Sequence, residues 1–185
     1  MLQTSLESLV QQILDSCSLV SPPIDLDAVA HHLEVNIKSV ELEDDISGFL
    51  VAGQGRTAAR VNARHQATHQ RWAKAQLLGY RALFSHAPTE HRFILDTNLA
   101  LLRRTDALET GSWKAAEYSA TPVERSDARQ LALALLMPSK LLMAETVRHD
   151  PTSELALAEL ARKFDVSSVA LMLRLLQLGI VQPAA

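Results

Sequence analysis

The sequence predicts an α+β fold that is mostly helical, with a small three-stranded, mostly antiparallel sheet packed on a long central helix. Apolar residues recur at helical spacing through most of the chain. β-Branched residues alternate between about residues 35 and 62, as they do in strands. One long helical pattern, about residues 68–85, follows directly. The six glycines and seven prolines among 185 residues are too few for a turn-rich all-β chain.

Composition excludes several classes of function. Hydrophobic residues make up 48% of the chain, enough for a sizeable core and too many for wholesale disorder. The 18 Lys+Arg against 21 Asp+Glu give a net charge of −3, which excludes a polybasic nucleic-acid coat or a membrane-surface protein. Cys17 is the single cysteine, so neither an internal disulfide nor a cysteine zinc cluster forms, and we expect a cytoplasmic protein.

Neither a targeting segment nor a membrane span is expected. No basic stretch precedes an apolar run near residue 1. The apolar stretch at about residues 166–178 is interrupted by Arg174 and Gln177, so it is too short and too polar to cross a bilayer.

Each element has its own local signal. Apolar periodicity predicts a first helix over 5–17, and Asp25 is expected to cap a second that runs through His32. Thr68 is expected to cap the central helix. The predicted strands are at 35–37, 46–51 and 59–62, with a hairpin turn at 53–55 and a further strand signal at 93–95. Later helices are predicted at about 125–137, 140–148, 155–164 and 167–178.

Residues 61–80 (VNARHQATHQRWAKAQLLGY) resemble the ImmA/IrrE family of small bacterial and phage zinc metallopeptidases, in which a strand ending in Val-Asn leads to a helix carrying His-Glu-x-x-His. The resemblance covers nearly the whole chain except 87–121. It implies a zincin-like core in residues 1–150 and a helix-turn-helix-like hairpin, packed on that core, in residues 151–182. The other matching segments follow in the family's order: Pro22–Ala30, Ile46–Leu50, Ala128, Leu135–Pro138, Leu160–Ser167 and Arg174–Gly179.

The catalytic positions implied by the resemblance have changed. In His-Glu-x-x-His, two histidines ligate zinc and the glutamate acts as general base on the bound water. Here the resemblance places Gln76 and Tyr80 at the ligands, Leu77 at the base and Arg125 at the third ligand. An amide is a poor zinc ligand, leucine accepts no proton, and a phenol ionises only near pH ~10. Arg125 is a fixed cation. We therefore expect no catalytic residue, no metal and no cofactor.

A displaced metal site is the alternative that keeps the chain an active zinc peptidase. Glu124 is one position from Arg125, and one step along a helix turns a side chain by about 100°. Zinc needs three or four converging ligands with support around them, and the sequence contains no obvious set. The other candidates are Asp127, His65, His69, His86, Glu90 and His91.

The C-terminal hairpin raises a second alternative, a DNA-binding regulator. A recognition helix needs Arg, Lys, Asn or Gln at its N-terminal end. The sequence has mainly serine and apolar residues at 167–172, so we expect this hairpin to pack against the protein rather than to read DNA.

The favoured hypothesis is a non-catalytic, pseudo-peptidase protein that acts by binding a partner. The resemblance implies the partner class, a helix-turn-helix repressor of phage, mobile-element or stress genes. The oligomeric state stays open, and neither nucleic acid nor membrane is an expected partner. Segment 87–121 departs furthest from the family, so its aromatic and arginine side chains are the expected binding residues: Trp113, Tyr118, Arg103 and Arg104.

Side chains in the middle of the central helix are expected to occupy the position of the active-site cleft of the family. Leu77 and Tyr80 should fill or line it. Gly79 costs about 1 kcal/mol relative to alanine in a helix interior, so a close backbone contact is expected to compensate for it.

Overall fold

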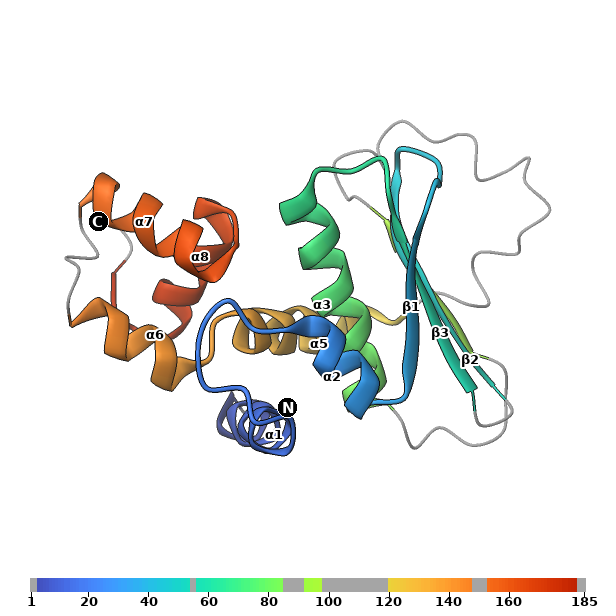
Figure 1. Cartoon of the computed structure of the whole chain (residues 1–185), viewed down its shortest axis with the longest axis horizontal. Helices are drawn as coiled ribbons and strands as arrows, with labels where there is room; N and C mark the ends of the chain where they lie inside the picture. Colours follow the sequence, from blue (N-terminus) through green and yellow to red (C-terminus); the bar gives the residue numbers. More distant parts are fainter. Residues whose placement is uncertain (1–2, 54–55, 85–91, 98–119, 148–152, 183–185) are drawn as a thin grey trace.

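The protein is an α+β structure in which a mixed sheet packs on one long helix. The computed structural model describes residues 3–53, 56–84, 92–97, 120–147 and 153–182. Figure 1 shows the sheet nearly edge-on at one end of the molecule, with helix α3 (Ala67–Leu83) against one face. The C-terminal helices lie at the opposite end, and α5 (Pro122–Leu136) joins the two ends. The predicted fold class is confirmed.

In the first half of the chain, two helices precede the first three strands of the sheet, and α3 follows them. Asp25 caps α2 as predicted, because its carboxylate accepts hydrogen bonds from the backbone N–H groups of Asp27 and Ala28 at 2.8 and 3.1 Å. The elements in order are α1 (Gln3–Ser16), α2 (Leu26–His32), β1 (Val35–Val40), β2 (Ile46–Gly53) and β3 (Arg56–Asn62).

The sheet has four strands rather than the three predicted. β4 (Arg92–Thr97) pairs antiparallel with β2 and confirms the strand signal at 93–95. The strand order is β1-β3-β2-β4; β1 is parallel to β3, and the other two pairings are antiparallel. The apolar pattern at 93–95 could not predict which strand β4 pairs with, because strand pairing depends on contacts between residues distant in sequence.

The predicted cap of the central helix is wrong. α3 begins at Ala67 with Gln66 as N-cap, and no side chain makes a capping hydrogen bond there. The preceding loop is held instead by Gln70, whose Nε2 donates to the carbonyls of Ala63 and His65 at 3.2 and 2.7 Å. Thr68 is exposed one residue inside the helix.

Helix α5 begins three residues earlier than predicted. Thr121 and Glu124 form a reciprocal capping box: the Thr121 hydroxyl accepts from the Glu124 N–H at 3.2 Å, and the Glu124 carboxylate accepts from the Thr121 N–H at 2.8 Å. Proline at the first helical position suits this start. The remaining helices lie close to their predicted bounds: α6 (Ser139–Thr146), α7 (Glu154–Phe164) and α8 (Ser168–Gln177).

Buried Arg174 links the C-terminal hairpin to the rest of the molecule. Its guanidinium donates to the Met137 carbonyl at 3.0 Å and to Gln177 Oε1 at 2.9 Å, and it forms an ion pair with Glu7 of α1 at 2.6 Å. No helix in the described part of the chain is long and apolar enough to cross a membrane.

Candidate functional site

Asn62, the last residue of β3, fixes the approach to the central helix. Its Nδ2 donates to the carbonyls of Glu43 and Ile46, each at 2.9 Å. Its Oδ1 accepts from the N–H groups of Leu42 and Arg64 at 3.2 and 3.0 Å. The side chain is completely buried. One amide therefore ties the loop between β1 and β2 to the segment that leads into α3.

His65 and His69 stack beside this junction. Their ring centroids are 4.3 Å apart with an interplanar angle of 24°. His69 Nε2 lies 3.0 Å from Ser47 Oγ, and His65 Nε2 lies 3.0 Å from the carbonyl oxygen of Asp44. Burial lowers the pKa of His69 below its usual value, and the neighbouring His65 lowers it further. This pair joins the start of α3 to the start of β2.

The middle of α3 is packed into the core. Gln76 and Tyr80 are 2% exposed and Leu77 is completely buried. A Cβ built on Gly48 of β2 would lie 3.2 Å from Leu77 Cδ1, so Leu77 packs against the sheet. These are the positions at which the family resemblance implies two zinc ligands and the general base.

A close contact joins α3 to α5. A Cβ added to Gly79 would lie 2.8 Å from the Ala128 carbonyl oxygen, so only glycine fits here without a shift. The contact expected around Gly79 is therefore confirmed. Arg125 is half-buried and lies three residues before Ala128, which puts both on one face of α5. Position 125 therefore lies on the side of α5 that faces the central helix.

The side chains at these positions do not fit a zinc ion. Zinc binds imidazole nitrogen, thiolate or carboxylate, whereas Gln76, Tyr80 and Arg125 offer an amide, a phenol and a guanidinium. The nearby carboxylate of Glu124 accepts the capping hydrogen bond described above. Among the residues that the structure describes, no three His, Cys, Asp or Glu side chains are grouped so that they could hold a metal ion.

Comparison with known families gives one assignment. Residues 56–176 match the family described as Peptidase_M78, IrrE N-terminal-like domain. The chain belongs to the IrrE N-terminal-like domain family. The match extends from β3 through the central helix and into α8, so it covers more than half of the chain. No curated protein matches this chain.

Some of the residues singled out from the sequence of this family member lie outside the described ranges. They are the expected binding residues Trp113, Tyr118, Arg103 and Arg104 and the candidate ligands His86, Glu90 and His91. Their roles stay predictions.

The second helix of the C-terminal hairpin presents apolar side chains to solvent. Val169 is 71% exposed and Leu173 is 52% exposed, whereas Arg174 is completely buried. Arg174 therefore lies in the interior and is not on the surface that would meet DNA.

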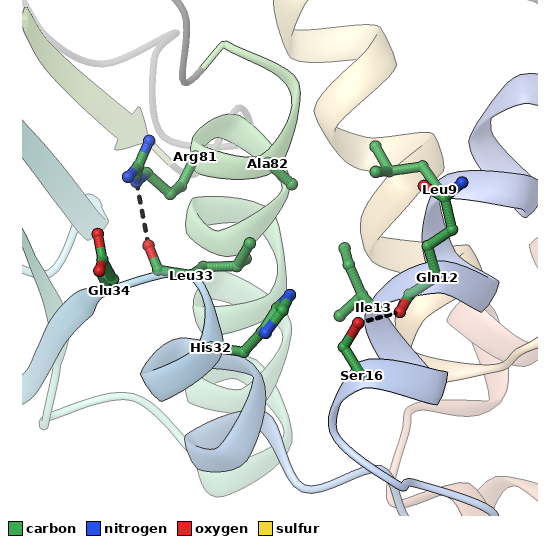
Figure 2. Close-up of a pocket in the computed structure, with 9 residues that line it drawn as sticks. All are labelled: Leu9, Gln12, Ile13, Ser16, His32, Leu33, Glu34, Arg81 and Ala82. Carbon is green, nitrogen blue, oxygen red and sulfur yellow. Dashed lines mark hydrogen bonds between the residues drawn. The ribbon is translucent and has the colours of Figure 1, made fainter.

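Two grooves border the helices of this domain. The first has a volume of about 360 Å³; Figure 2 shows Leu9, Ile13 and Ser16 of α1 on one side and His32 and Arg81 on the other. Arg81 Nε donates to the Leu33 carbonyl at 3.2 Å across its wall. None of the candidate catalytic, metal-binding or partner-binding residues lines the first groove.

The second, which we call the β1 groove, has a volume of about 520 Å³. No local sequence pattern predicts this groove, because its charged residues lie far apart along the chain. Arg71 Nη2 donates to the Ile24 carbonyl at 2.7 Å, and Arg71 Nε lies 3.5 Å from Asp165 Oδ2. The lining residues are Pro23–Asp27, Ile37–Ser39, Val61, Gln70, Arg71, Lys74 and Asp165.

Proposed function

We propose that this chain is a non-catalytic member of the IrrE N-terminal-like domain family that acts by binding another protein. The observation that supports the proposal is the state of α3, where Gln76, Leu77 and Tyr80 are buried in the core. A catalytic zinc needs an open coordination position for water and substrate. A side chain packed against Gly48 occupies the position of the general base.

The proposed partner is a helix-turn-helix repressor of phage, mobile-element or stress genes. This class follows from the resemblance of the chain to peptidases that cut such repressors. A family member that lacks the catalytic residues can still bind a repressor of the same fold. Binding without cleavage would then regulate the repressor by sequestration, or by competition with an active peptidase.

Metal content tests the non-catalytic part of the proposal. Protein purified without a histidine tag is expected to contain far less than one equivalent of zinc after mild chelation, measured by elemental analysis. One retained equivalent that is lost in Glu124→Gln or His86→Gln would establish a displaced metal site and overturn the proposal. Glu124→Gln is the suitable variant, because glutamine keeps the capping box intact.

A second experiment compares two reconstructed motifs. Gln76→His, Leu77→Glu and Tyr80→His together restore the ligands and base that the family resemblance implies. We expect this triple variant to bind zinc at least about tenfold more weakly than the same variant with Arg125→Glu, because a nearby fixed cation opposes a divalent metal. Equal zinc affinity of the two would mean that position 125 does not face the site.

Capture of a repressor tests the binding part. The chain would be co-expressed with the helix-turn-helix repressor encoded nearest to it, and the repressor is expected to co-purify at full length. A cleaved repressor would indicate a peptidase. A repressor that is neither bound nor cut would remove this partner class.

A further inference from the structure

Within the described residues, β1 is an edge strand of the sheet and lies along the β1 groove. β1 stands at one end of the described sheet and pairs only with β3 there. The Val40 carbonyl accepts from the Ala63 N–H at 2.8 Å, so the backbone of Val40 points towards β3. Backbone groups of alternate residues point to opposite sides of a strand. The N–H and C=O groups of Ile37 and Ser39 therefore point outward, beside the groove that these residues line.

The groove lies beside this edge and is lined by three separate parts of the chain as well as by β1. The segment Pro23–Asp27 forms the facing wall, and α3 contributes Gln70, Arg71 and Lys74. Its volume of about 520 Å³ lies within the range of sites that bind small ligands or short segments. An exposed strand edge offers main-chain hydrogen bonds to an added strand, and pockets alongside it select the side chains.

Three carboxylates and three cations line the groove, and Arg71 has a buried donor there without a hydrogen bond to the described residues. The carboxylate of Asp25 caps α2, and that of Asp27 pairs with Lys74. Arg71 is only 16% exposed at its side chain, yet its Nε has no hydrogen bond in the described structure, and Asp165 is 3.5 Å away and half exposed. A guanidinium offers five donors in a fork that matches a carboxylate. Arg71, on α3, lines the groove together with Ile37 and Ser39 of β1.

We propose that the β1 groove binds an extended segment of a partner protein as an added strand on β1, with an Asp or Glu side chain of that segment on Arg71. This inference rests on the proposed function and names the surface through which it acts. The groove lies on a different face of α3 from the positions of Gln76 and Tyr80. Partner binding therefore needs no opening of the old catalytic centre.

The test is selection of random displayed peptides on the immobilised full-length chain in the presence of a chelator. Enriched peptides are expected to carry an acidic residue among alternating apolar residues. Each enriched peptide is then synthesised in two N-methylated forms, methylated at one or the other alternate set of amides. One form is expected to lose about tenfold or more in affinity and the other to bind as the parent, since only one set pairs with an edge strand.

Variants of the chain locate the binding site. Ser39→Pro removes an outward N–H and is expected to weaken binding about tenfold, whereas Ser39→Ala keeps the N–H and serves as the matched control. Arg71→Gln is expected to abolish the preference for an acidic peptide over its amide counterpart. Arg64→Gln, at an exposed ion pair with Asp44 outside the groove, is the control for charge.

Three results would overturn the inference. They are the absence of enriched peptides, equal binding of both N-methylated forms, and self-association of the chain that Ser39→Pro abolishes, which would assign the edge to a second copy. The N-methylated peptides decide the question even if a variant fails to fold. Zinc-dependent cleavage of a bound peptide would refute the proposed function and leave the groove assignment standing.

Discussion

Replacing Glu7 by leucine should destabilise the protein strongly, because it leaves the charge of Arg174 buried without a counter-ion. Arg174 is completely buried, whereas the Glu7 side chain is 23% exposed. The Glu7–Arg174 contact is 2.6 Å, and the two residues are 167 positions apart. Burial lowers the pKa of Arg174, and the charge of Glu7 and its hydrogen bond oppose that shift. Glu7 therefore offsets part of the free-energy cost of burying the Arg174 charge.

The magnitude follows from which partners remain. In Glu7→Leu, Arg174 keeps only the neutral oxygens of Met137 and Gln177, and breaking a buried pair from one side costs about 3–5 kcal/mol. Glu7→Gln keeps an acceptor, so its cost should be about 1–2 kcal/mol, the difference between a charged and a neutral hydrogen bond. Adding Arg174→Met to Glu7→Leu removes the stranded charge, and the double variant should be more stable than Glu7→Leu alone.

Urea unfolding followed by circular dichroism measures the unfolding free energy of four variants. They are Glu7→Leu, Glu7→Gln, Arg174→Met and the double variant Glu7→Leu/Arg174→Met. The coupling free energy between positions 7 and 174 should be about 2 kcal/mol or more, with unchanged dependence on urea concentration. Additivity within about 0.5 kcal/mol would refute the reasoning. It would mean that Arg174 is stabilised by the two neutral acceptors or by water rather than by Glu7.

Three further predictions concern the central helix and its approach. Gly79→Ala should lower the unfolding free energy by about 1–3 kcal/mol despite the better helix propensity of alanine, because the new Cβ meets the Ala128 carbonyl; increased stability in urea unfolding would contradict this. Asn62→Ala should cost about 3 kcal/mol in the same assay, since the completely buried Asn62 amide makes four hydrogen bonds to backbone groups; a loss below about 1 kcal/mol would mean that water replaces the amide. The pKa of His69 is lowered in the folded state, so the unfolded chain binds more protons and stability should fall as the pH drops below about 6.5. His69→Gln should flatten this part of the pH profile, and an unchanged slope would assign it to another group.

Local sequence signals predicted the elements but not the contacts that hold them. Asp25 was a correct prediction because an N-cap acts on the N–H groups two and three residues ahead. Thr68 was wrong, although it has the right side chain, because Asn62 and Gln70 set where the loop ends and α3 begins. Those hydrogen bonds depend on the position of the loop before β2, which no window around residue 68 contains.

The candidate site was predictable only in part for the same reason. Resemblance to the family pointed to Gln76, Leu77 and Tyr80, and the large apolar side chains of Leu77 and Tyr80 suggested that these two fill or line the old cleft; all three are buried. The family resemblance did not predict the β1 groove, because Arg71 and Asp165 come together only in the folded chain. No local signal predicted the burial of Arg174, because its partner Glu7 lies near the other end of the sequence.

Two glycine contacts explain how this fold tolerates the residues now found on α3. Gly48 lets the sheet approach Leu77, and Gly79 lets the backbone of α5 approach the helix at Ala128. The Gly79 contact is with the backbone of Ala128, whereas the Gly48 contact with α3 is with the side chain of Leu77. The spacing of α3 and α5 at Gly79 is therefore set without the side chains of Gln76, Leu77 and Tyr80. Leu77 and Tyr80 are buried in the core, so their apolar contacts add to the stability of this part of the fold.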